Sequence, residues 1–157
     1  MQLTTPAPTD GQCWNWKANI AEGRNRLSQG RGTARAYAGQ ISRTRTFTDM
    51  VNQINADRAR QRLQAITVTI PPFTAAQVED DAIRAYNGFG NNRDVFGLPL
   101  HEFRLVMAGG VPQLTVDPTT NTGTAQWERV PVAARGTSGN PNYVANVQAA
   151  DPRCGGP

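Results

Sequence analysis

The chain of 157 residues lacks any long apolar run. No segment approaches the roughly 18 consecutive apolar residues of a membrane-spanning helix, so we expect no membrane partner. Its opening, MQLTTPAPTD, lacks the basic cluster and apolar core that mark a secretory leader. The phosphate-loop pattern GxxxxGKS/T and the zinc-protease pattern HExxH are also missing, which argues against those two enzyme classes.

Histidine and cysteine are scarce. The single histidine, His101, begins a predicted strand with no marked nucleophile near it, so a structural or surface role is expected rather than a catalytic triad. Two cysteines and one histidine cannot supply a standard four-ligand zinc site without carboxylates. We therefore expect no metal and no cofactor. Cys13 and Cys154 lie near opposite ends, where they form one disulfide or remain two unrelated thiols.

Lysine is almost absent, because Lys17 is the only one among 16 cationic residues. The charge is uneven: residues 1–72 hold ten basic and four acidic residues, whereas residues 73–157 hold six and eight. A basic half suits nucleic acid, anionic lipid or an anionic cell-wall polymer. The plainer interpretation is an arginine-rich, solvated helix surface.

Periodicity and capping patterns predict three helical regions. A capping box at Thr9 and Gln12 opens a helix near 12–28, which Gly30 and Gly32 are expected to end. Residues 33–64 have a thin apolar stripe, which predicts one or two helices lying on the surface.

A second capping box predicts a helix over 74–87, opened by Thr74 and Gln77. Acidic residues 79–81 come early in this helix, where the helix dipole favours anions. Asn87 and Gly88 can end it. The residues expected to form its buried stripe are Ala75, Val78, Ala82 and Tyr86.

Strand signals dominate the second half. Residues 65–73 alternate but meet two prolines, which predicts an extended connector or an edge strand. Residues 99–132 predict a three-stranded antiparallel meander. A final helix near 140–149 follows, with Asn140 as its cap and Pro141 at its first position. The predicted class is α+β, mainly α, with a small antiparallel sheet in a single domain over residues 1–157.

Carboxylates are the groups that a glycosidase would need, usually with one held protonated by burial. Glu22 and Glu79 lie among polar residues on predicted helices and are expected to be solvated. Glu102 and Glu128 fall in the predicted hairpins, where they can pair with Arg104 or Arg129. None of the four stands in an evidently apolar pocket.

Four stretches, in order, resemble the core of lysozyme-like and lytic-transglycosylase domains, the peptidoglycan glycosidases of phage and type VI secretion effectors. MQLT followed by NIAEGRNRL resembles that family's GLMQL-type turn and the helix after it. AIRAYNG resembles the family's Ala-Tyr-Asn helix end, which lines the glycan cleft. WERVPV and NPNYVANV resemble its later hairpin and final helix. The basic insertion between RNRLSQ and FTAAQ departs from the family's shorter pattern.

The resemblance implies a lysozyme-like fold that binds and cleaves peptidoglycan glycan strands. It places Gln2 at the cleft floor, and Tyr86 and Asn87 at the helix end that faces the cleft. Trp14 is expected to stack on sugar, and the plain alternative for Tyr86 is a core tyrosine. The implied location is the periplasm or cell wall, reached through a secretion system or phage.

The resemblance does not supply a catalytic residue. In the family the catalytic glutamate precedes the GLMQL-type turn, and this chain begins at that turn. We therefore expect one piece of a larger enzyme, with an upstream domain or a delivery protein as partner. The alternatives are a non-catalytic cell-wall-binding or assembly module and, less favoured, an arginine-rich nucleic-acid binder. Phosphate binding would weaken steeply with salt, whereas glycan binding would not.

Overall fold

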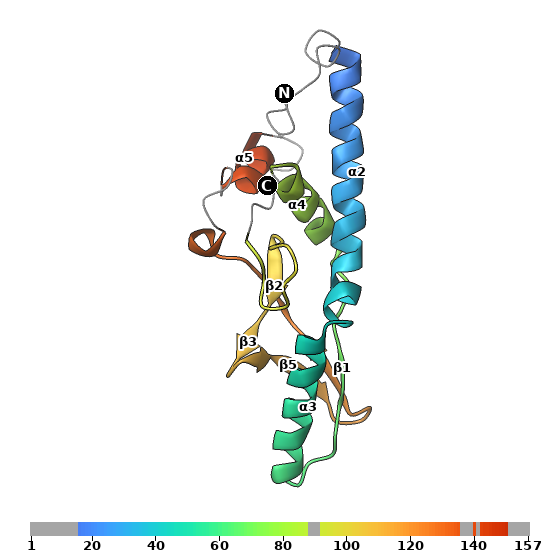
Figure 1. Cartoon of the computed structure of the whole chain (residues 1–157), viewed down its shortest axis with the longest axis vertical. Helices are drawn as coiled ribbons and strands as arrows, with labels where there is room; N and C mark the ends of the chain where they lie inside the picture. Colours follow the sequence, from blue (N-terminus) through green and yellow to red (C-terminus); the bar gives the residue numbers. More distant parts are fainter. Residues whose placement is uncertain (1–15, 88–91, 136–139, 141, 151–157) are drawn as a thin grey trace.

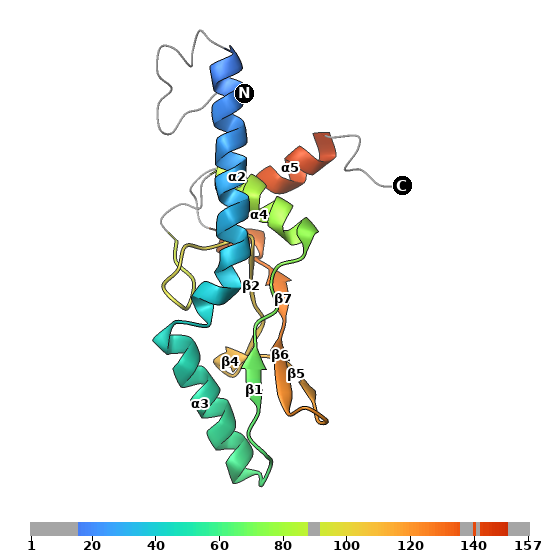
Figure 2. The same cartoon turned by 90° about the vertical axis from the view of Figure 1, so that its right-hand side faces the viewer.

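A computed structural model describes residues 16–87, 92–135, 140 and 142–150. Its longest element is helix α2 (Trp16–Ile41), and α3 (Arg45–Arg60) follows after a short turn. Figures 1 and 2 show α4 (Ala75–Tyr86) and α5 (Tyr143–Ala150) beside α2, while α3 and most strands lie beyond its far end. None of the described helices is both long and apolar enough to cross a bilayer.

The first helix is much longer than predicted, because it does not end at Gly30 or Gly32. Gly30 faces α4, where a Cβ would stand only 3.1 Å from the Cα of Ala82. The glycine therefore permits close packing of two helices, and this packing outweighs its weak helix propensity. The prediction that Gly30 and Gly32 terminate the helix was wrong.

The prediction of helices within residues 33–64 is confirmed, since this segment holds the end of α2 and all of α3. Thr44 caps α3 by accepting a hydrogen bond from the backbone nitrogen of Phe47 at 3.2 Å. The helices are not purely superficial, however. Tyr37, Ile41 and Phe47 are buried in the main core.

Helix α4 begins and ends where the sequence predicted. The side chain of Thr74 accepts from the Gln77 nitrogen at 3.2 Å, and the Gln77 side chain accepts from the Thr74 nitrogen at 2.9 Å. Within the expected stripe Val78 and Ala82 are buried, Tyr86 is half-buried and Ala75 is exposed. No acidic residue lies in the first turn of the helix. Residues 79–81 therefore lie too far from its N-terminus for the favourable interaction with the helix dipole that the sequence predicted.

The strands do not form the predicted three-stranded meander. The described strands form three small sheets instead. The first has three strands in the order β1 (Thr67–Thr69), β6 (Thr122–Ala125) and β5 (Leu114–Asp117). The other two are pairs: β2 (Phe103–Leu105) with β7 (Trp127–Arg129), and β3 (Met107–Ala108) with β4 (Val111–Pro112). The β1–β6 pair is parallel and the other pairs are antiparallel. The α+β, mainly α class with small antiparallel pairs is confirmed.

Strand β1 lies at the edge of its sheet, as one of the two interpretations of residues 65–73 predicted. Asn55 of α3 holds its start: the side chain accepts from the Ile66 nitrogen at 2.9 Å and donates to the Ile66 oxygen at 3.1 Å. This double hydrogen bond imitates a strand neighbour. It fixes α3 against the sheet.

Aromatic packing joins the helices to the strands. The Tyr37 ring stacks on His101 with centroids 3.8 Å apart, and Phe73 meets Trp127 edge-on at 4.7 Å. The Trp127 indole donates to the Pro71 oxygen at 2.9 Å, so its polar edge is satisfied within the core. His101 is buried here, so the surface alternative predicted for it does not apply.

The predicted final helix is confirmed as α5, although it begins at Tyr143, after the expected cap Asn140. The Asn142 nitrogen donates to the side-chain oxygen of Asn140 at 2.9 Å. Helix α5 packs against α4 and contributes the buried side chain of Val144. Pro141 lies outside the described residues.

Candidate functional site

Tyr86, the residue that sequence reasoning placed at a glycan cleft, stands at the C-terminal end of α4. It lies over Gly23 of α2, where a Cβ would stand 3.7 Å from the Tyr86 hydroxyl oxygen. The phenol therefore packs against α2 at ordinary van der Waals distance from Gly23. Grooves lie on both sides of the ring, and Tyr86 lines both.

The groove on one side of Tyr86, which we call the polar groove, has a volume of about 310 Å³. Its wall from α2 carries a carboxylate, a guanidinium, an amide and a hydroxyl. Glu22 and Arg26 are ion-paired across one helical turn at 2.9 Å. The residues that line the polar groove are Glu22, Arg26, Gln29, Gly30, Thr33, Ala85 and Tyr86.

The groove on the other side, which we call the apolar groove, has a volume of about 480 Å³. Helices α2, α4 and α5 form its walls, and all but two of its lining residues are apolar, aromatic or glycine. The exceptions are Asn19 and Arg24. The residues that line it are Asn19, Ile20, Gly23, Arg24, Leu27, Ile83, Tyr86, Tyr143 and Val147.

The hydroxyl of Tyr86 is buried and finds no hydrogen-bond partner among the described residues. Burial and the nearby Tyr143 raise the pKa of Tyr86, while Arg26 lowers it and Glu22 raises it. The hydroxyl is therefore protonated at neutral pH and can donate a hydrogen bond. A buried polar group without a partner costs about 1–3 kcal/mol, which a ligand oxygen could recover.

The remaining expected site residues fall elsewhere. Asn87 caps α4, and its amide nitrogen donates to the Asn140 oxygen at 3.0 Å, so it ties the helix to the segment before α5. Asn87 is not among the lining residues of either groove. Gln2, Trp14 and the possible disulfide pair Cys13 and Cys154 lie outside the described residues.

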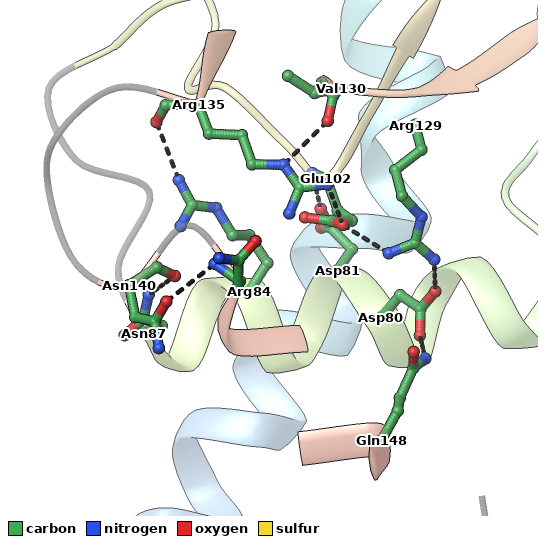
Figure 3. Close-up of polar contacts among 11 residues, drawn as sticks. Asp80, Asp81, Arg84, Asn87, Glu102, Arg129, Val130, Arg135, Asn140 and Gln148 are labelled. Carbon is green, nitrogen blue, oxygen red and sulfur yellow. Dashed lines mark hydrogen bonds and ion pairs between the residues drawn. The ribbon is translucent and has the colours of Figure 1, made fainter. Parts of the chain in front are cut away.

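A buried charge network positions α4, and with it Tyr86 (Figure 3). Glu102 at the start of β2 is wholly buried and is paired with Arg129 at 2.6 Å and Arg135 at 2.9 Å. Arg129 also pairs with Asp80 of α4, whose other oxygen accepts from Gln148 of α5. Strand β7 and helix α5 are thus both tied to Asp80 of α4.

The second half of the network uses the neighbouring residues of α4. Asp81 accepts from the Glu102 backbone nitrogen at 2.7 Å and is joined to His101 Nδ1 at 2.7 Å. Arg84 donates to the backbone oxygen of Arg135 at 3.2 Å. Because Asp80, Asp81 and Arg84 all face inward, two of the three acidic residues expected to favour the helix dipole anchor α4 instead.

Burial is the largest influence on Glu102 and raises its pKa, which Arg135, Arg129 and Arg84 partly offset. A raised carboxyl pKa is what a general acid requires. Glu102, however, is enclosed by its ion pairs and lines none of the cavities described here. We assign it a structural role.

The other carboxylates named as candidates are engaged at the surface. Glu79 forms a two-pronged pair with Arg31 at 2.8 Å, and this hydrogen bonding lowers the pKa of Glu79. Glu128 pairs with Arg104 at 2.6 Å, as the sequence predicted. Glu128 borders a third cavity, of about 530 Å³, where Asp94 accepts a 2.5 Å hydrogen bond from Tyr37.

Sequence reasoning missed the residues that join Tyr86 in its grooves. Glu22 was expected to be merely solvated, yet it lines the polar groove beside Arg26. Its i,i+4 spacing from Arg26 was a readable signal of an ion pair. Nothing in the sequence indicated that Tyr143 would meet Tyr86, because their contact depends on how α5 packs against α4.

Comparison with known proteins identifies no relative, since no protein-family model, curated protein or solved structure matches the chain. In the described part of the chain, no group of three or more His, Cys, Asp or Glu side chains gathers to hold a metal ion.

Proposed function

We propose that this chain binds peptidoglycan glycan strands in the polar groove beside Tyr86, as part of a lysozyme-like or lytic-transglycosylase-like system. The observation that carries the proposal is the Tyr86 phenol, a protonated and unpartnered donor beside a wall of polar side chains. Sugars present hydroxyls at their edges and C–H groups on their faces. An aromatic ring next to a carboxylate, guanidinium and amide therefore offers both kinds of contact.

Cleavage requires a catalytic acid in addition to the groups that bind the glycan. Breaking a glycosidic bond needs a carboxylic acid that protonates the leaving group, and general acid–base catalysis contributes about 10²–10⁴-fold. Among the described residues that line the polar groove, Glu22 is the only carboxylate, and Arg26 pairs with it. We therefore expect weak or no hydrolysis by this chain alone, and activity when a glutamate-bearing partner segment is supplied.

Binding is tested by co-sedimentation of the full chain with purified peptidoglycan sacculi. Tyr86→Phe and Gln29→Ala should each lower the bound fraction at equal protein concentration. Tyr143→Phe is the matched control, because Tyr143 lines the apolar groove and not the polar one. Equal binding by all variants and wild type would contradict a glycan site at Tyr86.

Salt dependence separates this proposal from polyanion binding by the arginine-rich helices. Sacculus binding through hydroxyl contacts should change little between 50 and 200 mM salt, whereas a protein making several phosphate contacts loses about 10³-fold or more. Released muropeptides measure cleavage in the same samples. Robust release by the chain alone would place the acid within it, and Glu22→Gln would then test the groove carboxylate.

A further inference from the structure

The apolar groove between α2, α4 and α5 is a surface of a kind that folded chains normally cover. Ile20 has 56% of its surface exposed, although it lies beside Leu27 and Val147 in the same groove. Exposed apolar side chains gathered in a concave site mark interaction surfaces more often than isolated ones do. In Figures 1 and 2, α4 and α5 stand on the same side of α2, which leaves three helices around one concavity.

The shape of the groove fits a helix. It follows α2 from Asn19 to Leu27, which is about 12 Å at 1.5 Å per residue, or slightly more than two helical turns. A fourth helix packed against three helices buries the apolar side chains that they expose toward the same space, as in four-helix bundles. An amphipathic helix lying in such a groove is a recurring mode of recognition.

The positive charge of Arg24 indicates which kind of partner the apolar groove would bind. Arg24 is the only charged residue that lines it, and its guanidinium makes no hydrogen bond or ion pair with any described residue. A cation at the edge of an apolar surface favours a partner with a carboxylate beside its apolar stripe. A partner carrying lysine or arginine there would be repelled.

We propose that the apolar groove docks an amphipathic helix of a partner polypeptide, with aliphatic residues on one face and an acidic residue that pairs with Arg24. Docking here is separate from glycan binding, because the two grooves lie on opposite sides of Tyr86. The docked helix would cover Ile20 and Leu27.

The probe is a synthetic peptide of about 14 residues, four helical turns, with leucines at i, i+4, i+7 and i+11 and glutamates along one edge. A second peptide carries lysines in place of the glutamates. Fluorescence anisotropy with the full chain should show the acidic peptide binding about tenfold more tightly, a difference of about 1.4 kcal/mol. Arg24→Glu should reverse this preference.

Two further variants locate the site. Ile20→Glu should abolish binding of the acidic peptide, whereas Leu63→Glu and Arg43→Glu should leave it unchanged, since neither residue lines the groove. Equal affinity for the two peptides, or no binding of either, would overturn the proposal. So would self-association of the chain that Ile20→Glu removes, because a second copy would then be the occupant.

Thermal unfolding without peptide completes the test. Ile20→Glu should leave the midpoint close to that of wild type, because an exposed side chain contributes little to stability. A fall of several degrees would mean that another part of this chain already covers the groove, and the partner helix would be ruled out. None of these measurements involves sugar, so failed docking and failed glycan binding are distinguishable.

Discussion

Replacing Gly30 with alanine tests the helix crossing that builds both grooves. A Cβ at Gly30 would lie 3.1 Å from the Ala82 Cα, and 3.3 Å from both the Ala82 oxygen and the Ala85 Cβ. Two of these atoms are backbone, so relief requires α2 and α4 to move apart. Overpacking of this kind costs about 1–3 kcal/mol.

The opposing effect is the helix propensity of alanine, which gains roughly 0.5–1 kcal/mol over glycine. Gly32 provides the matched control, because it lies in the same helix with nothing within 4 Å of an added Cβ. Gly32→Ala should therefore stabilise the protein by the propensity gain alone. The difference between the Gly30 and Gly32 variants isolates the steric cost, because the propensity gain is common to both.

Urea unfolding followed by circular dichroism measures this difference. We expect Gly30→Ala to be less stable than Gly32→Ala by about 1–3 kcal/mol, with the dependence on urea unchanged. In thermal unfolding each kcal/mol corresponds to about 2–4 °C for a chain of this size. Equal stability of the two variants would refute the close crossing, and with it the geometry that places Tyr86 over Gly23.

Three further predictions concern single side chains. Tyr37→Phe should destabilise the protein by about 1–3 kcal/mol in urea unfolding, because Asp94 loses the hydrogen bond from the Tyr37 hydroxyl. Tyr86→Phe should cost no stability, because the Tyr86 hydroxyl has no hydrogen-bond partner among the described residues. Thr74→Ala should cost about 1 kcal/mol by removing the cap of α4, and Thr74→Ser should restore it. The raised pKa of Glu102 means that the native state holds this proton more tightly than the unfolded chain does, so the free energy of unfolding falls as pH rises from the ordinary value of about 4.5 through the raised pKa. Relative to wild type, Glu102→Gln should therefore gain stability as pH rises above 4.5, and a relative loss would show that the three arginines outweigh burial.

Local signals in the sequence were sufficient for the elements that local chemistry defines. The capping box at Thr74 and Gln77 fixed the start of α4, because its hydrogen bonds join residues three apart. Asn140 indicated the start of α5 only approximately, because the helix begins at Tyr143. The pairing of Glu128 with Arg104 is one of the alternatives that the sequence left open.

The candidate site was predictable only in part. Tyr86 was named because AIRAYNG resembles a family's helix end, whereas its neighbours Glu22 and Tyr143 come from helices distant in sequence. The arrangement of strands was equally hidden, because β1 pairs with β6 across more than 50 residues. Non-local pairings leave no periodic signal in the chain.

By itself, then, the sequence determined the helix capped by Thr74 and Gln77 and the mixed class. Only the tertiary structure decided that α2 continues through Gly30, because a missing Cβ disrupts a helix in isolation and yet permits close contact with Ala82. It also decided that Asp80, Asp81 and Arg84 turn inward, since their burial depends on Glu102, Arg129 and Arg135 meeting them there. A charged residue can be buried only where its partners converge, and that convergence is a property of the packed chain.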